Sequence, residues 1–216
     1  MRHSLDASLR AALYLAMPAS VGLWLLGKPL ISTLFQNSRF SAQSTDMVVW
    51  ALSWYALGLV SHSVVEIVTR AYYAQKDTRT PVTIGLMTML INVTLSIILT
   101  AAFQSFRLMP HGALALANTI ATTLEMIVLL WILRSKIGWT IDKSMLFSIA
   151  RTIGGVIAMA LVLTIWMNLG PASVLVLTLS GVALGGMTFW VVTALLGSEQ
   201  AFRIPAIIRN NLRHLR

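Results

Sequence analysis

The stretch Arg70-Ala-Tyr-Tyr-Ala-Gln-Lys-Asp-Thr-Arg-Thr-Pro81 is the most polar run between two long apolar segments. Pro81 has a fixed φ and no N–H group, so it suits the first turn of a new helix. Asp77, Thr78 and Thr80 carry side-chain oxygens that can accept the free N–H groups of that turn. Three basic side chains within ten positions make the run positively charged. The stretch therefore predicts a tight, basic elbow between two helices.

Just before the elbow, Glu66 and Arg70 stand four residues apart, a spacing that brings two side chains together on one helix face. We expect an ion pair near the end of a span, with the arginine at the depth of lipid headgroups, where it can meet a phosphate. The alternative is a membrane-end salt bridge that has no further role. The residues assigned to the elbow are Glu66, Arg70, Lys76, Asp77, Arg79 and Pro81.

The composition is that of a membrane protein. Of the 216 residues, 57% are hydrophobic and only 11% are charged, whereas a soluble domain has about a quarter charged residues. The formal charge of +9 is compatible with nucleic-acid binding, but the basic residues lie between apolar segments, where membrane topology explains them better. The absence of cysteine excludes disulfides and thiolate metal sites.

Six segments are long and apolar enough for helices that cross a hydrocarbon core, which takes roughly 20 residues. Because the runs are continuously apolar, they lack the alternation of a membrane β-barrel. The sequence therefore predicts an all-α bundle of six transmembrane helices. The segments are Ala11–Phe35, interrupted by Pro18 and by Gly27-Lys28-Pro29, then Met47–Ala74, Val82–Phe103, Ala113–Leu133, Met145–Leu169 and Val174–Leu196.

Basic residues divide unequally between the two sides of this bundle. Of the 16 lysines and arginines, only Lys28, Arg39 and Arg107 fall on one side. The others lie near the N-terminus, in the elbow, after the fourth span and in the tail. Because basic loops remain in the cytoplasm, both termini are predicted to be cytoplasmic.

The tail from Gln200 onward has a different pattern. Ile204, Ile208, Leu212 and Leu215 share one helical face, while arginines occupy another. This pattern predicts a basic amphipathic helix at the membrane surface. A disordered basic tail is the alternative.

Four polar residues lie near the middle of predicted spans, where an ionisable group costs about 2.5–3.5 kcal/mol on insertion scales. Glu125 lies roughly 18 Å from the start of its span, and His62, Asn92 and Asn118 lie at similar depth, where the four can meet. One interpretation is a polar cavity, or a cation or proton site. The other interpretation is a set of hydrogen bonds that only hold helices together. This second interpretation is favoured for Asn92 and Asn118, and His62 is assigned to packing. Both interpretations stay open for Glu125.

No enzyme signature is present in the sequence: there is no H-E-x-x-H, G-x-S-x-G or P-loop motif. The chain is therefore predicted not to be an enzyme. No cofactor or metal is expected, apart from a coupling cation or the membrane potential.

Several stretches resemble the MurJ/MviN family of lipid II flippases, and the elbow is the most specific of them. The last two spans match only in length and placement, but the resemblance covers essentially the whole chain. The other matching stretches are Met17-Pro18-Ala19, Lys28-Pro29-Leu30, Leu34-Phe35-Gln36 with Arg39-Phe40-Ser41-Ala42 and Thr45, and His111-Gly112-Ala113-Leu114-Ala115-Leu116-Ala117.

The resemblance implies a fold of fourteen spans, with two lobes of six helices and an extra pair that forms a groove for a lipid tail. On this basis, residues 1–144 hold the last four spans of the second lobe, residues 145–199 the groove-forming pair and residues 200–216 the basic tail. The chain is then expected to be the C-terminal portion of a flippase: a fragment, one half of a split gene or a truncated record of a longer chain.

The function implied by the resemblance is transport of an undecaprenyl-diphosphate-linked peptidoglycan precursor across the bacterial inner membrane, for cell-wall synthesis and cell shape. The expected partners are this lipid, membrane lipids and the missing N-terminal lobe; no nucleic acid is expected. The resemblance implies that the family's transport-critical arginines and aspartate lie in the first lobe and the early second lobe, outside this chain. Two alternatives remain: another exporter of the superfamily, for an oligosaccharide lipid or a drug, and a membrane scaffold that transports nothing.

Some members of the family bind a cation between the spans that match the third and fourth here. The resemblance places Asn92 at one ligand and Ser96 where a carboxylate would help. Thr119 and Thr122 are further candidate ligands.

Overall fold

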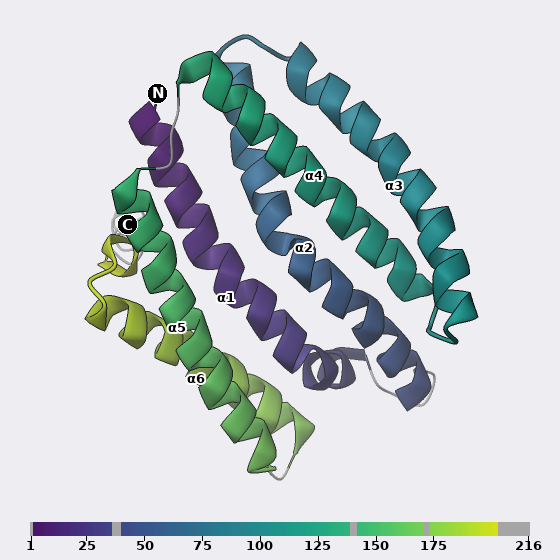
Figure 1. Cartoon of the computed structure of the whole chain (residues 1–216). Helices are drawn as coiled ribbons and strands as arrows, with labels where there is room; N and C mark the ends of the chain where they lie inside the picture. Colours follow the sequence, from purple (N-terminus) through teal and green to yellow (C-terminus); the bar gives the residue numbers. More distant parts are fainter. Residues whose placement is uncertain (1, 36–39, 139–141, 171–172, 203–216) are drawn as a thin grey trace, which may run out of the picture.

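The computed structural model describes residues 2–35, 40–138, 142–170 and 173–202. This part of the chain contains six helices, each long and apolar enough to cross a membrane, so the predicted all-α fold and number of spans are confirmed (Figure 1). They are α1 (Arg2–Phe35), α2 (Ala42–Ala74), α3 (Arg79–Ser105), α4 (His111–Ile137), α5 (Lys143–Asn168) and α6 (Val174–Leu195).

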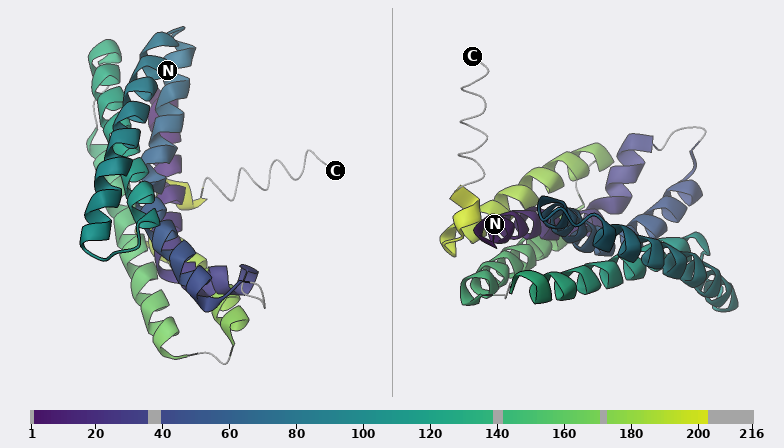
Figure 2. Two further views of the ribbon diagram at one scale, coloured as in Figure 1. Left: turned by 90° about the vertical axis from the view of Figure 1, so that its right-hand side faces the viewer. Right: turned by 90° about the horizontal axis from the view of Figure 1, so that it is seen from above.

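The helix α1 lies between the two parts of the bundle. It packs against α2 on one side and against α5 and α6 on the other, while α4 packs on α2 and α3 lies outermost on α4. The neighbours of α3 are α4 and, to a small extent, α2, and Figure 2 shows the bundle from the side and from above. The starts of α1, α3 and α5 and the ends of α2 and α4 lie at one end of the bundle.

The first helix is longer and more regular than its sequence predicts. A break is expected at Pro18 and near Pro29, but α1 continues through both. Prolines are tolerated in membrane helices where neighbouring helices support the backbone, and α1 contacts three neighbours. The prediction for Pro81 is confirmed, because this residue lies in the first turn of α3.

Two groups of buried apolar side chains hold α1 in place. The first group contains three leucines of α1 at intervals of four residues, Leu5, Leu9 and Leu13. The second group contains Tyr14 and Leu26 of the same helix. Opposite sides of one helix thus join both parts of the bundle. The first group also includes Val64, Val68, Tyr72, Leu129, Leu133 and Met145, and the second also includes Met159, Leu163, Phe189 and Ala201.

The helices α2 and α4 approach closely at Gly58. A Cβ atom added there would lie 2.7 Å from Thr119 Oγ1 and 3.3 Å from Thr119 Cα. The Thr119 hydroxyl donates to the Trp54 carbonyl at 2.8 Å across the same contact. Because lipid provides no hydrophobic drive between helices, small residues that allow close packing largely determine how they associate. Gly58 therefore sets the spacing of α2 and α4.

The variant Gly58→Ala should lower the free energy of unfolding by about 1–3 kcal/mol, the usual cost of overpacking, because the new methyl group must displace Thr119. Thermal unfolding in detergent measures this. Gly186→Ala is the matched control, since a Cβ there has no heavy atom within 4 Å and alanine favours a helix by about 1 kcal/mol over glycine. Equal midpoints for the two variants would contradict this account of the contact.

Candidate functional site

The elbow between α2 and α3 is a tight turn, as predicted. Lys76 adopts a φ of 59°, and the N–H groups of Gln75 and Asp77 both donate to the Tyr72 carbonyl. The Asp77 carboxylate accepts the Thr80 N–H at 3.0 Å and the Thr80 hydroxyl at 2.7 Å. Asp77 thus satisfies a free backbone donor in the first turn of α3, as the sequence indicates.

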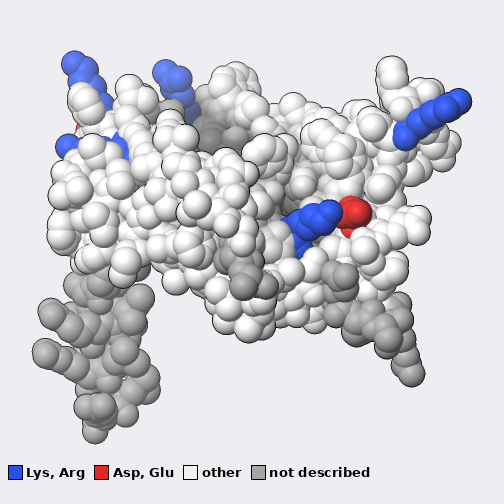
Figure 3. Space-filling model, turned by 90° about the horizontal axis from the view of Figure 1, so that it is seen from below, with Lys and Arg blue, Asp and Glu red and all other residues white. Residues whose placement is uncertain are grey.

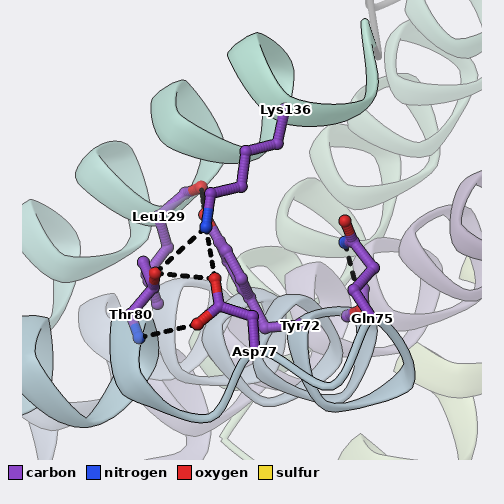
Figure 4. Close-up of polar contacts among 7 residues, drawn as sticks. Tyr72, Gln75, Asp77, Thr80, Leu129 and Lys136 are labelled. Carbon is purple, nitrogen blue, oxygen red and sulfur yellow. Dashed lines mark hydrogen bonds and ion pairs between the residues drawn. The ribbon is translucent and has the colours of Figure 1, made fainter.

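Lys136, near the end of α4, reaches over this turn (Figure 4). Its ammonium group donates to the Asp77 carboxylate and, at 3.2 Å, to the Thr80 hydroxyl. The same group lies 5.5 Å from the centre of the Tyr72 ring, within range of a cation–π interaction. The buried Tyr72 hydroxyl donates to the Leu129 carbonyl at 2.9 Å. We call Tyr72, Asp77, Thr80 and Lys136 the elbow clamp, because together they tie α4 to α2 and to the turn.

The elbow clamp alters the acidity of Asp77. The hydrogen bonds from Lys136 and from Thr80 hold the pKa of the Asp77 carboxyl well below its usual range, because they favour the charged form. Sequence reasoning places Asp77 in the elbow but misses Lys136, which is 59 positions away. A lysine in the last turn of a helix is ordinary, so no local signal joins the two.

The predicted pair of Glu66 and Arg70 is present. Arg70 donates to Glu66 Oε1 from Nη2 at 2.7 Å and from Nε at 3.2 Å. Both side chains are exposed at the surface of the chain, with 75% of Arg70 and 65% of Glu66 accessible. Lys76 and Arg79 are exposed as well, so the basic charge of the elbow remains at the surface.

Glu125 lies at the contact between α3 and α4. Its Oε2 accepts a hydrogen bond from the Thr88 hydroxyl at 3.2 Å, and a Cβ added at Gly85 would lie 3.6 Å from its Oε1. Among the described residues, no lysine, arginine or histidine pairs with this carboxylate. The described hydrogen-bond partner of Glu125 is thus an uncharged group of α3.

The other mid-span residues form two separate groups. Thr122 links α2 to α4, since its hydroxyl lies 3.4 Å from His62 Nε2 and 3.4 Å from Asn118 Oδ1. Asn92 instead accepts a hydrogen bond from Ser96 within α3, at 3.5 Å. Hydrogen bonds thus connect His62 to Asn118, but they do not connect either one to Asn92.

The depths of these groups nevertheless agree. The contact of Thr88 with Glu125 sets antiparallel α3 against α4, so Asn92, one turn beyond Thr88, lies about one turn before Glu125 along α4. That level is close to Thr122. Similar depth in the membrane stays a prediction, and the described hydrogen bonds do not join the four side chains into one cluster.

No described hydrogen bond joins the two candidate cation ligands on α3 to the two on α4, so the cation site stays a prediction. Thr119 donates to a carbonyl of α2 and packs on Gly58, so its hydroxyl faces α2, whereas Asn92 and Ser96 belong to α3. These groups supply no carboxylate, and the described residues contain no cluster of three histidines, aspartates or glutamates that could hold a metal ion. We therefore assign no transport step to a cation at these residues.

An apolar groove of about 580 Å³ lies between α1, α5 and α6. A Cβ added at Gly22 or Gly186, on facing walls, meets no heavy atom within 4 Å. The sequence assigns a groove to the last two spans alone, but α1 supplies a whole wall. The other residues that line the groove include Leu15, Leu23, Leu30, Val182 and Trp190.

These features define a multi-pass helical membrane protein with a basic elbow, polar residues at mid-depth and an apolar groove at its side. The family model described as "Lipid II flippase MurJ" matches residues 1–206, and the chain belongs to this family.

Individual relatives agree with this assignment. The chain is 29% identical over 203 residues to a probable lipid II flippase MurJ of Vibrio cholerae, which covers 90% of the chain and 37% of the relative. It is 27% identical over 197 residues to a probable lipid II flippase MurJ of Rhizobium meliloti. This match covers 88% of the chain and 36% of the relative. The chain thus spans little more than a third of the length of these relatives.

A solved structure, titled "Lipid II flippase MurJ, inward closed conformation", has the same fold. The comparison gives a TM-score of 0.77 at 22% identity and covers 90% of this chain and 38% of that one.

Asp77→Asn should lower the thermal midpoint at pH 7, because an amide is a weaker partner for the Lys136 ammonium group. The pKa of Asp77 is lowered in the folded protein. Its stabilising contribution is therefore fully present above the unfolded value of about 3.9 and is lost as the pH falls toward the folded value. The difference between wild type and variant should shrink below about pH 4.

The control for this experiment is Glu66→Gln, which removes an exposed ion pair within one helix and should change the midpoint less. A midpoint difference for Asp77→Asn that stays constant across this pH range would show that the carboxylate charge is irrelevant to the elbow clamp.

Proposed function

We propose that this chain forms the C-terminal portion of a lipid II flippase, which moves an undecaprenyl-diphosphate-linked peptidoglycan precursor across the bacterial inner membrane by alternating access. The family match over residues 1–206 carries this proposal. It favours lipid II over another lipid-linked oligosaccharide or a drug, and it favours a transporter over a scaffold. Such transport moves a lipid between leaflets and requires no covalent chemistry.

The distribution of charge supports cytoplasmic termini. Lys76, Arg79 and Lys136 lie at the end of the bundle where α1 begins. The opposite end carries few charges, and the surface seen from below is mostly uncharged (Figure 3). There Lys28 pairs with Asp46 at 2.8 Å, which reduces the net charge of that end further. The positive-inside rule then places the elbow in the cytoplasm.

Reporter fusions test this orientation. A fusion that ends at Lys76 should give a cytoplasmic signal, and a fusion that ends at Arg107 should give a periplasmic one, because these turns lie at opposite ends of α3. Alkaline phosphatase and a fluorescent protein, which are active on opposite sides of the inner membrane, provide the two readouts. High phosphatase activity at Lys76 would reverse the orientation.

The groove between α1, α5 and α6 is suited to the polyprenyl tail. Its lining is almost entirely apolar, and it is open where Gly22 and Gly186 lack side chains. Lipid chains are already apolar, so the groove gains from van der Waals contact with the tail rather than from the hydrophobic effect. We assign α5 and α6 to tail binding on this basis, with α1 as the wall they share with the rest of the bundle.

The diphosphate requires positive charge that the middle of this bundle does not provide. Among the described residues, the basic side chains lie toward helix ends, as Arg70 and Lys136 do. Glu125 would repel a desolvated diphosphate. We therefore assign Glu125 to the contact of α3 with α4 during the conformational cycle, rather than to direct binding of the diphosphate.

A transport assay in a flippase-depleted strain tests the proposed function. The 216-residue chain alone should insert, because each helix satisfies its own backbone, but it should not restore growth or lipid II transport. Production together with the whole preceding part of a relative, which is its first lobe and the first two spans of its second lobe, should restore both. Glu125→Gln should then reduce transport at an unchanged protein level.

The outcomes of this assay separate the claims. Lack of rescue by both halves, when both are inserted, contradicts the flippase assignment. Full activity of Glu125→Leu shows that the carboxyl group is neither a site nor a necessary contact. Transport by the purified chain alone, above protein-free vesicles, contradicts the requirement for two lobes.

A further inference from the structure

Two hydroxyl bridges join α1 to α6, one at each end of the apolar groove. The Tyr14 hydroxyl lies 2.8 Å from the Thr193 hydroxyl, in a buried position. At the other end, the Thr33 hydroxyl lies 3.0 Å from the Thr178 hydroxyl. Thr178 and Thr193 each lie about one turn past the residues of α6 that line the groove. The two bridges therefore mark the ends of the groove.

The bridges lie near the two faces of the hydrocarbon core. Tyr14 and Thr33 are roughly 28 Å apart along α1, and Thr178 and Thr193 are roughly 22 Å apart along α6, at 1.5 Å per residue. A hydrocarbon core is about 30 Å thick. The groove thus runs through most of the core, and the helices that form its walls are joined at both of its ends.

Each bridge has a defined donor, because its threonine on α6 uses its own hydrogen elsewhere. Thr193 donates to the Phe189 carbonyl at 2.8 Å. Thr178 donates to the Val174 carbonyl at 2.7 Å. Since a hydroxyl has a single hydrogen, the two hydroxyls of α1 are the donors of the bridges. Separating α1 from α6 would break both bonds, and lipid chains offer no replacement partner.

The chain after α6 also closes one end of the groove. Gly197 adopts a φ of 70°, and the chain turns back so that Ala201 is fully buried and lines the groove. The ring N–H of Trp190 donates to the Ala201 carbonyl at 2.9 Å. Gln200 Oε1 accepts a hydrogen bond from the Ser148 hydroxyl of α5 at 3.3 Å. Because α5 and α6 both hold this turn, it is a fixed part of the wall.

Between the bridges, space for a ligand is already present. The groove of about 580 Å³ exists while both bridges are formed, and ligand pockets commonly measure about 300–1,000 Å³. A Cβ added at Gly22 or Gly186 meets no heavy atom within 4 Å. A flexible apolar chain can therefore occupy the groove without separating α1 from α6.

We propose that α1 and α6 stay joined at both bridges while a polyprenyl chain enters and leaves the groove between them. The ends of the groove are then closed throughout transport, and the chain passes into the groove along its length rather than through an end. This inference rests on the assignment of the groove to the polyprenyl tail and adds the route by which the tail reaches it.

A disulfide in place of one bridge tests the first end, because the chain has no cysteine of its own. Thr33→Cys together with Thr178→Cys replaces two oxygens that are 3.0 Å apart, so a sulfur–sulfur bond needs a shift of roughly 1 Å. A short bifunctional methanethiosulfonate joins the thiols if oxidation is incomplete. The probe is tritiated undecaprenyl phosphate, and its binding to the 216-residue chain in nanodiscs is measured.

The oxidised and reduced forms should bind the probe with affinities within about twofold of each other, because the locked end is not the entrance. A loss of at least about tenfold on oxidation, reversed by a reductant, would overturn the proposal. Gly186→Phe is the blocked control, since its ring fills the groove, and it should bind at least about tenfold more weakly than the matched variant Gly186→Ala.

Thr193→Val tests the other end. Valine keeps the shape of the buried side chain but removes the acceptor of Tyr14. If the chain entered here, a loosened end would speed binding; we expect a rate within about twofold of wild type, and an increase of at least about tenfold would contradict the closed end. Thr193→Ser, which keeps the hydroxyl, is the matched control. The lock between Thr33 and Thr178 decides its own end even if Thr193→Val does not fold.

The outcomes separate this inference from the proposed function. If neither wild type nor the reduced cysteine variant binds the probe, or if Gly186→Phe binds as well as Gly186→Ala, the groove does not hold the tail. Loss of binding in the oxidised form alone contradicts the closed ends and leaves the tail assignment standing.

Discussion

Because Gly58 has no side chain, α2 and α4 approach closely enough for Thr119 to bond to the backbone of α2. This contact sets the register of two parallel helices. One turn along, it brings His62 against α4 at mid-depth, and further along it brings the buried Tyr72 hydroxyl to an α4 carbonyl. Lys136 then lies within reach of the elbow. A single close approach thus positions both the mid-span contacts and the elbow clamp.

The second constraint is that hydrocarbon offers no hydrogen bonds, so each polar group in a span needs a partner in the protein or in water. The bundle meets this constraint differently on each face. Thr88 accompanies Glu125 between helices, while the outer face of α3 is apolar. Tyr55, His62, Glu66 and Arg70 on α2 are exposed in the part of the chain that the structure describes. The groove between α1, α5 and α6, by contrast, is lined almost entirely by apolar side chains.

Parts of the site were predictable because their signals are local in sequence. The pair of Glu66 and Arg70 follows from i, i+4 spacing, and the capping role of Asp77 follows from its place before a proline-containing first turn. The depth of Glu125 follows from counting residues. Its partner Thr88 had no such signal, because the two meet only when α3 packs on α4. The four mid-span polar residues do not share one network of hydrogen bonds. Their common depth stays a prediction from sequence position, whereas contact depends on the rotation of each helix about its axis.

The sequence alone determined the number of spans, their approximate ends, the basic elbow and the side of the membrane on which the elbow is predicted to lie. These properties depend on hydropathy and charge along the chain, which act segment by segment. The tertiary structure decided that α1 passes unbroken through two prolines and forms a wall of the groove. It also decided that Lys136 closes over the elbow and that His62 lies on an exposed face. The physical reason is that a membrane helix is stable in any rotation as an isolated element, and only close packing against its neighbours selects the face that each side chain occupies.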